Sequence, residues 1–166
     1  MVTRSTIPKL DEQRIWQELE NITDPEIPVL SLVDMKIIRK VNINENGVSI
    51  LISPTFVGCP ALEYIKDEIR TRLTAIGGGT VRIETTYTPP WSTDMLDEKV
   101  REKLRSFGIA PPALTTGIPA TLTIPTACPF CASFHTHIEN EFGATLCKQL
   151  FYCDDCLQSF EKFKML

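Results

Sequence analysis

Two Cys-x-x-Cys pairs near the C-terminal end constrain this chain most, Cys128-Pro-Phe-Cys131 and Cys153-Asp-Asp-Cys156. Structural zinc sites are tetrahedral and commonly hold four thiolates, which closely spaced pairs can supply from two tight turns. The segment 132–152 slightly exceeds the usual spacing and is long enough for a short β-hairpin to bring the pairs together. We therefore predict one zinc ion bound by these four cysteines, with unrelated thiols or disulfides as the weaker alternative. A closed four-thiolate site indicates a structural metal, because no coordination position is open for chemistry.

Length and composition limit the class of protein. The chain has 166 residues, enough for one ordinary domain or for one domain with a small module. A net charge of -4 argues against a nucleic-acid partner, and no apolar run is long enough to span a membrane. The start of the sequence, MVTRSTIPKLDEQ, has no hydrophobic signal region, so the six cysteines indicate a reducing cytoplasm.

Apolar periodicity before the cysteine pairs alternates between helical and strand-like spacing. Helical spacing recurs around 10–22, in a stripe after Pro60, and after Ser92, which we expect to cap the third helix. Strand-like segments flank Asn46-Gly47, a pair that favours a hairpin turn, and alternation returns over 81–87. The sequence thus predicts an α/β (α+β) fold, with a small three-stranded sheet packed by helices and then a β-rich zinc ribbon.

A proline-rich stretch separates the zinc-binding end from the rest of the chain. We place an α/β domain at 1–110, a semi-extended linker at 111–125 and the zinc ribbon at 126–166. So short a ribbon is too small to be stable through its own core, and structural zinc can contribute on the order of 10 kcal/mol. We expect each module to have its own core, so that Cys128→Ser should damage the ribbon alone. The expected apolar lining of the ribbon is Phe142, Leu146, Leu150, Phe151 and Phe160.

Cys59 is the strongest candidate for chemistry in the first domain. It directly precedes the helix that we expect to begin at Pro60, and the free N–H groups and dipole of a helix start favour an anion. We therefore expect a lowered pKa for the Cys59 thiol, which would make it a better nucleophile or metal ligand. A buried, inert cysteine that packs like a small apolar residue is the alternative.

Three further residues of the first domain carry groups that could act with this thiol. Asp24 and Glu26 share a tight Asp-Pro-Glu turn, where carboxylates could contact the Cys59 loop, bind a metal or simply stabilise the turn. Thr55 could orient a ligand or cap the following helix. From the residues alone we favour turn stabilisation for the two carboxylates, and for Thr55 the structural explanation is as good as the functional one.

Three residues of the ribbon could compete with the four cysteines as ligands. Cys147 lacks a Cys-x-x-Cys partner, and we expect it on a strand, facing the small core of the ribbon rather than the zinc. His135 and His137 alternate on an expected strand, and we interpret both as exposed. Since both histidines lie in the ribbon, no Ser-His-Asp set can be assembled, and Cys59 has no nearby base in sequence.

Several motifs resemble the iron–sulfur assembly family that includes SufT-like proteins and eukaryotic cytosolic assembly factors. Two of them, Asp24-Pro25-Glu26-Ile27-Pro28 and Gly58-Cys59-Pro60-Ala61, carry the general resemblance. Further segments narrow it to the PaaD family of bacterial phenylacetyl-CoA epoxidase systems. These segments are Pro89-Pro90-Trp91-Ser92-Thr93-Asp94, Phe107-Gly108-Ile109-Ala110-Pro111-Pro112, Glu141-Phe142-Gly143 and Phe160-Glu161-Lys162-Phe163-Lys164.

The resemblance implies a role in maturing the epoxidase system rather than an enzymatic reaction of its own. Its candidate site is Asp24, Glu26, Thr55 and Cys59, which would handle iron or an iron–sulfur cluster transiently, and the expected partner is the reductase or the diiron oxygenase. A single thiolate cannot hold a cluster, so Cys59 would act with the carboxylates, with another subunit such as a second copy in a homodimer, or by transient transfer. The alternatives are a structural or regulatory subunit without metal transfer and, less favoured, a thiol-dependent enzyme.

Overall fold

The computed structural model describes residues 11–45, 47–114 and 125–165. Its elements in chain order are α1 (Glu12–Glu20), β1 (Ile38–Asn44), β2 (Gly47–Ile52), α2 (Leu62–Ala75), β3 (Thr80–Thr85), the 3₁₀ helix η1 (Thr93–Met95), α3 (Glu98–Ser106), β4 (Ile109–Ala110), β5 (Thr136–Asn140), β6 (Lys148–Cys153) and β7 (Gln158–Phe163). None of the helices in these ranges has the length and apolar character needed to cross a membrane.

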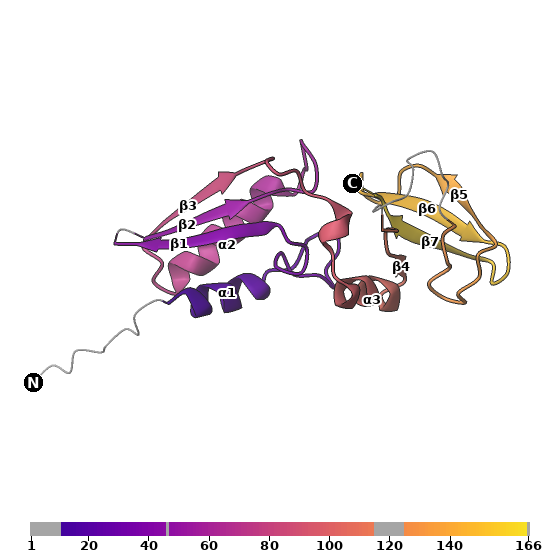
Figure 1. Cartoon of the computed structure of the whole chain (residues 1–166), viewed down its shortest axis with the longest axis horizontal. Helices are drawn as coiled ribbons and strands as arrows, with labels where there is room; N and C mark the ends of the chain where they lie inside the picture. Colours follow the sequence, from indigo (N-terminus) through magenta and orange to yellow (C-terminus); the bar gives the residue numbers. More distant parts are fainter. Residues whose placement is uncertain (1–10, 46, 115–124, 166) are drawn as a thin grey trace, which may run out of the picture.

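The first module is a three-stranded sheet packed by helices, as the sequence predicts. β1 and β2 form the antiparallel hairpin, and β3 pairs with β2 in parallel, so the chain must return through α2. Burial alternates along β2, where Val48, Ile50 and Ile52 are buried and the residues between them are partly exposed. This alternation leaves one apolar face on the sheet, and α1 and α2 run alongside it (Figure 1).

Two helices begin later than the sequence indicates. α2 starts at Leu62, so Pro60 lies before the helix and not in its first turn. Ser92 caps η1 through Asp94 N–H, whereas α3 has Asp97 as its N-cap, accepting a 3.0 Å hydrogen bond from Val100 N–H. The predicted Ser92 cap of the third helix is therefore wrong. The apolar stripe continues through the 3₁₀ turn and hides the break between the two helices.

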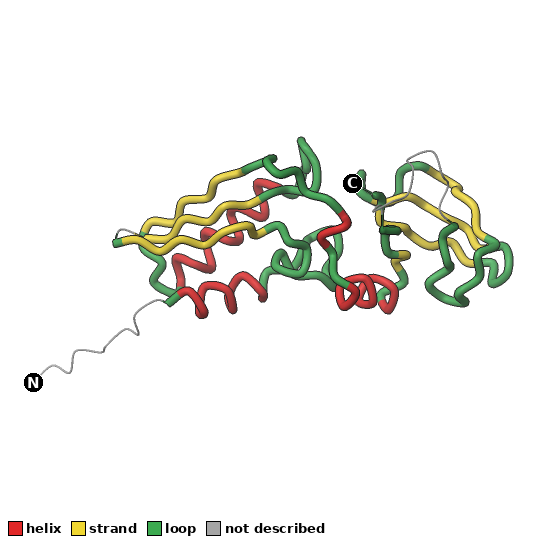
Figure 2. Tube along the Cα trace, in the orientation of Figure 1, coloured by secondary structure: helices red, strands yellow, loops and turns green. Residues whose placement is uncertain are grey.

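The second module is a four-stranded sheet in the order β4-β7-β6-β5. Figure 2 shows the strands of both modules in yellow. Its small core contains Phe151 and Phe160, which stack with ring centroids 5.7 Å apart, as expected. Phe142 and Leu146 instead are more than half exposed, so their predicted place in the core is wrong. They lie in the segment that joins β5 to β6, outside the paired strands.

Each module contributes buried residues to the core of the other. Phe163 and Cys147 of the ribbon belong to the large apolar cluster of the first module, and Phe163 meets Trp91 edge to face with centroids 6.1 Å apart. In return, β4 pairs in parallel with β7 and places Ala110 in the ribbon core. The expectation of fully separate cores is therefore wrong. The division into domains at 1–110, 111–125 and 126–166 stays a prediction, and residues 115–124 of the proposed linker lie outside the described residues.

Candidate functional site

The four ribbon cysteines meet at one point. Cys128 Sγ lies 3.6 Å from Cys156 Sγ, and Cys131 Sγ lies 3.6 Å from Cys153 Sγ; all four sulfurs are within 4.8 Å of one another. These separations are too long for disulfides, whose S–S bond is about 2.05 Å. They match the edge of a tetrahedron around zinc, about 3.8 Å for Zn–S bonds of about 2.3 Å.

Both cysteine pairs use the same local turn. The N–H of Ala132 donates to the carbonyl of Cys128 and that of Leu157 to the carbonyl of Cys153, each at 2.9 Å. Ala132 and Leu157 both adopt positive φ, near 60°, which turns the chain back after each pair. Backbone N–H groups of Cys156 and Asp155 lower the pKa of the Cys153 thiol to about 7, which favours the thiolate that zinc requires.

Asp24 fixes the Asp-Pro-Glu turn. Its Oδ1 accepts hydrogen bonds from Glu26 N–H at 2.8 Å and Ile27 N–H at 2.9 Å, and the side chain is buried. Burial raises the pKa of this carboxyl, and the two N–H donors only partly offset that effect. The turn-stabilising interpretation of Asp24 is therefore confirmed, and the turn aims the next carboxylate, that of Glu26, toward the ribbon.

Glu26 joins the first module to the ribbon. Its Oε2 lies 3.3 Å from Cys147 Sγ, so the thiol can donate to the carboxylate, and its backbone carbonyl accepts from Lys148 Nζ at 3.4 Å. Lys148 is itself buried and pairs with Glu161 at 2.6 Å. Sequence reasoning missed both ribbon partners, because this contact spans more than a hundred residues and leaves no local signal.

Cys147 stands outside the zinc ligands, as predicted, but faces the core of the first module and not that of the ribbon. Its Sγ also lies 3.1 Å from Thr145 Oγ1. Burial raises the pKa of the Cys147 thiol to about 12, with the charge of Glu26 acting in the same direction.

The charges of the same two carboxylates act on Cys59. It is half-buried in the loop between β2 and α2, beside Gly58, whose φ of +84° turns the chain there. Burial raises the pKa of its thiol, the charges of Glu26 and Asp24 raise it further, and N–H groups at the approach to α2 only partly oppose them. The predicted lowering of this pKa is wrong, because burial of the thiol and the charges of Glu26 and Asp24 together outweigh the N–H groups at the approach to α2.

The remaining predicted candidates are less engaged. Thr55 is half-buried in the same loop, but in the part of the chain that is described no hydrogen bond joins it to Asp24, Glu26 or Cys59. His135 and His137 are exposed, as predicted, and each pairs through Nδ1 with an aspartate of the second cysteine turn, Asp155 and Asp154, at 3.1 Å.

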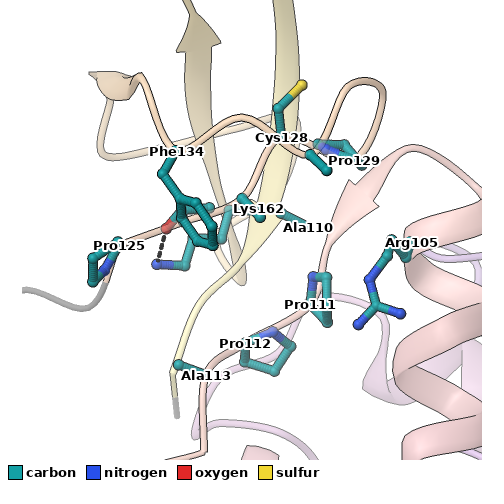
Figure 3. Close-up of a pocket in the computed structure, with 13 residues that line it drawn as sticks. Arg105, Ala110, Pro111, Pro112, Ala113, Pro125, Cys128, Pro129, Phe134 and Lys162 are labelled. Atoms are coloured by element: carbon teal, nitrogen blue, oxygen red, sulfur yellow. Dashed lines mark hydrogen bonds between the residues drawn. The ribbon is translucent and has the colours of Figure 1, made fainter.

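A separate cavity of about 340 Å³ opens where α3 and β4 meet the ribbon. In Figure 3, Pro111 and Pro112 form one wall and Phe134 lies opposite, with Lys162 between them donating to Thr126 Oγ1 at 2.8 Å. Among the described residues that line it are none of the carboxylate or thiol groups around Glu26. The cavity is thus distinct from the candidate site.

Comparison with known proteins places this geometry in a family. The chain is 40% identical over 162 residues to an Escherichia coli K12 protein that is provisionally named as the D-subunit of 1,2-phenylacetyl-CoA epoxidase, covering 98% of both chains. The chain belongs to the same family as this epoxidase D-subunit. Residues 118–164 match the PaaD zinc beta ribbon domain, and residues 12–85 match the iron–sulfur cluster assembly protein family. The resemblance inferred from the motifs is confirmed, and the four cysteines are those of a zinc ribbon.

Other relatives match the first module and cover 56–58% of this chain. A protein of Porphyromonas gingivalis named Fe-S protein maturation auxiliary factor is 32% identical over 56% of this chain and 90% of its own. A conserved hypothetical protein of Thermotoga maritima shares the fold with a TM-score of 0.50 at 26% identity, covering 58% of this chain and 95% of that one. A domain of unknown function, DUF59, from Bacillus anthracis gives a TM-score of 0.52 at 24% identity, over 56% and 90% of the two chains. The predicted α+β fold is confirmed.

Proposed function

We propose that this protein is an accessory maturation factor of a phenylacetyl-CoA epoxidase system. It delivers iron or an iron–sulfur cluster to the reductase or to the diiron oxygenase, with Cys59 as the transient ligand. The zinc ribbon holds the module together and docks on the client. The protein carries out no reaction on the organic substrate itself.

The half-buried thiol of Cys59, on which the charges of Glu26 and Asp24 act, is the observation that carries this proposal. A thiol and carboxylates together offer the ligand types that iron accepts, and the thiol is half-buried, so an incoming metal can still reach it. The names of two relatives support the assignment, because one is provisionally named as a subunit of the epoxidase and the other as a maturation auxiliary factor. The zinc ligands are saturated by four thiolates, which leaves the transfer chemistry to the first module.

Client iron content in cells tests the proposal. Cells that lack the native protein are complemented with the wild type, Cys59→Ala or Val57→Ala, and each epoxidase component is purified anaerobically for iron and sulfide analysis. We expect the wild type and Val57→Ala to restore the client and Cys59→Ala to leave it depleted, because only the last removes the ligand. Val57 is a matched control, since it is 77% exposed in the same loop.

Full iron and sulfide in the client of Cys59→Ala cells would overturn the transfer role. Such a result, together with loss of a client complex when the ribbon is disrupted, would favour a structural subunit. Zinc content of each purified variant shows that the fold is retained.

A further inference from the structure

Lys162 of the ribbon is a buried lysine without a carboxylate partner. The residue is 8% exposed, and lysine is rarely buried to that extent unless it is paired. Among residues 11–45, 47–114 and 125–165, no aspartate or glutamate forms an ion pair with its ammonium group. The remaining residues of the sequence include no aspartate or glutamate, so no acidic side chain of this chain neutralises Lys162.

A second buried lysine, on the neighbouring strand, shows what Lys162 lacks. Lys148 of β6 pairs with Glu161 at 2.6 Å. The contacts of Lys162 on β7 are neutral, since its ammonium group donates to Thr126 Oγ1 at 2.8 Å and lies 5.2 Å from the centroid of the Phe151 ring. An ammonium group has three N–H donors, so the hydroxyl and the ring leave one donor for a ligand. Burial lowers the pKa of Lys162, and no nearby acid in the described structure opposes that effect.

Lys162 lines two adjoining cavities. The first, of about 340 Å³, lies where α3 and β4 meet the ribbon, and the second, of about 410 Å³, is lined by residues of β5, β6 and β7. Both cavities share Pro125, Thr126, Phe134 and Lys162. In Figure 3 the Lys162 side chain extends into the space between Phe134 and Pro112, so its ammonium group is accessible from the first cavity. Cavities of a few hundred cubic ångströms accommodate small organic ligands.

The lining of the first cavity favours a ligand with a single negative charge. The prolines after β4 and the Phe134 ring provide apolar surface on opposite sides. The other cation in the lining, Arg105, already pairs with two glutamates of its own helix, α3. One free ammonium donor matches a carboxylate, whereas a phosphate group carries more charge and is usually held by several donors.

We propose that this cavity binds a small organic monocarboxylate, whose carboxylate pairs with the Lys162 ammonium group and whose apolar body packs between Pro112 and Phe134. The ligand contacts both modules, because Pro112 follows β4 and the other two residues belong to the ribbon. Its binding therefore stabilises the contact between the modules. This inference is independent of the proposed iron delivery, since the described residues that line the cavity include none of the candidate iron site.

Titration of the zinc-loaded full chain tests the proposal, with benzoate as the probe and benzamide as its uncharged analogue. The ¹³Cε signals of labelled lysine report on the ammonium groups, and Lys162→Met assigns the signal of interest. We expect saturable one-to-one binding of benzoate, at least about tenfold tighter than that of benzamide, because a hydrogen bond between charged groups contributes that much. Acetate should also bind at least about tenfold more weakly than benzoate, since each buried CH₂ group contributes roughly fourfold in affinity. Benzoate, but not benzamide, should raise the pKa of Lys162, because a carboxylate favours the charged amine.

Two lysine variants locate the binding site. Lys162→Met should lose at least about tenfold in affinity for benzoate and keep its weak affinity for benzamide. It should unfold at an equal or higher urea concentration than the wild type, because it removes a buried charge without a partner. Lys164→Met is the matched control, since Lys164 contacts the Phe142 ring and lines neither cavity, and it should leave both affinities unchanged.

Three results would overturn the proposal: no saturable binding of benzoate to the wild type, equal affinity for benzamide, or unchanged benzoate affinity in Lys162→Met. N-acetylglutamate α-amide presents a carboxylate as a protein side chain would. Tighter binding of this probe than of benzoate would assign the cavity to an acidic peptide and contradict a small-molecule ligand. If Lys162→Met fails to fold, the unaltered chain decides, because a Lys162 pKa that does not rise with benzoate contradicts the proposal.

Discussion

In the absence of metal, the negative charge of Glu26 disfavours the thiolate form of Cys59. Burial and the nearby carboxylates raise the pKa of the Cys59 thiol, so the thiol is protonated near neutral pH. A protonated thiol resists oxidation and alkylation, because the thiolate is the reactive form. Under the proposed function, protonation would protect the Cys59 thiol until an iron cation arrives, and the positive charge of that cation would offset the effect of the carboxylates.

Replacing Glu26 with Gln should make Cys59 more reactive. The substitution removes a negative charge that opposes the thiolate, so the pKa of Cys59 should fall and its alkylation at neutral pH should accelerate. Iodoacetamide labelling against pH, with peptides mapped by mass spectrometry, measures both quantities in zinc-loaded protein. Glu20→Gln, at the exposed end of α1, is the control and should change neither. A wild-type midpoint below the reference of about 8.5 would contradict this account.

At the scale of single elements, α3 connects the two modules, and its stability depends on the capping residue at its N-terminus. Asp97 accepts from Val100 N–H, while Arg101 within the helix is buried and donates to the carbonyls of Thr93, Leu96 and Pro112. The helix therefore fixes both the turn before it and the chain that enters the ribbon after β4. Loss of the cap would loosen the region between the modules.

Asp97→Ala should cost about 1 kcal/mol of unfolding free energy, the typical value of an N-cap. Asp97→Asn keeps a good cap and loses only the exposed ion pair with Lys36, so its cost should be much smaller. Urea denaturation of the three proteins at neutral pH gives the comparison. Ser92→Ala, which affects η1, is a further control; a larger effect there than at Asp97 would show that Ser92 is the more important cap.

Local signals explain which elements could be predicted from the sequence. Asn46-Gly47 between alternating segments predicts the hairpin β1–β2, and paired cysteines at fixed spacing predict the zinc site. The sequence misplaces the start of α3 because Ser92 and Asp97 are both good capping residues a few positions apart. The contact between Cys147 and Glu26 could not be predicted, since it depends on how two modules dock.

At the scale of the whole molecule, two residues of the ribbon complete the core of the first module. Phe163 is fully buried against Trp91, and Cys147 lies in the same cluster. Zinc therefore stabilises more than the ribbon, because the ion organises strands whose residues complete the other core. The shared core leads us to expect that Cys128→Ser weakens both modules.

Phe163→Ala should destabilise the protein by about 3–5 kcal/mol, as expected for a large buried aromatic residue. Tryptophan fluorescence and zinc release should follow the same denaturant midpoint in the wild type if the modules unfold together, and both midpoints should fall in the variant. Phe134→Ala removes an aromatic ring that is 63% exposed and should change stability by less than about 0.5 kcal/mol. Two separate midpoints in the wild type would show that the modules unfold independently.

Delivery of iron through Cys59 is the central claim, and direct transfer between purified proteins tests it most directly. The chain is loaded anaerobically with ⁵⁷Fe and sulfide and mixed with the iron-free reductase or oxygenase component, and Mössbauer spectra are recorded after the proteins are separated. We predict that the ⁵⁷Fe signal moves to a client from the wild type and not from Cys59→Ala. Equal transfer from both proteins would contradict the account.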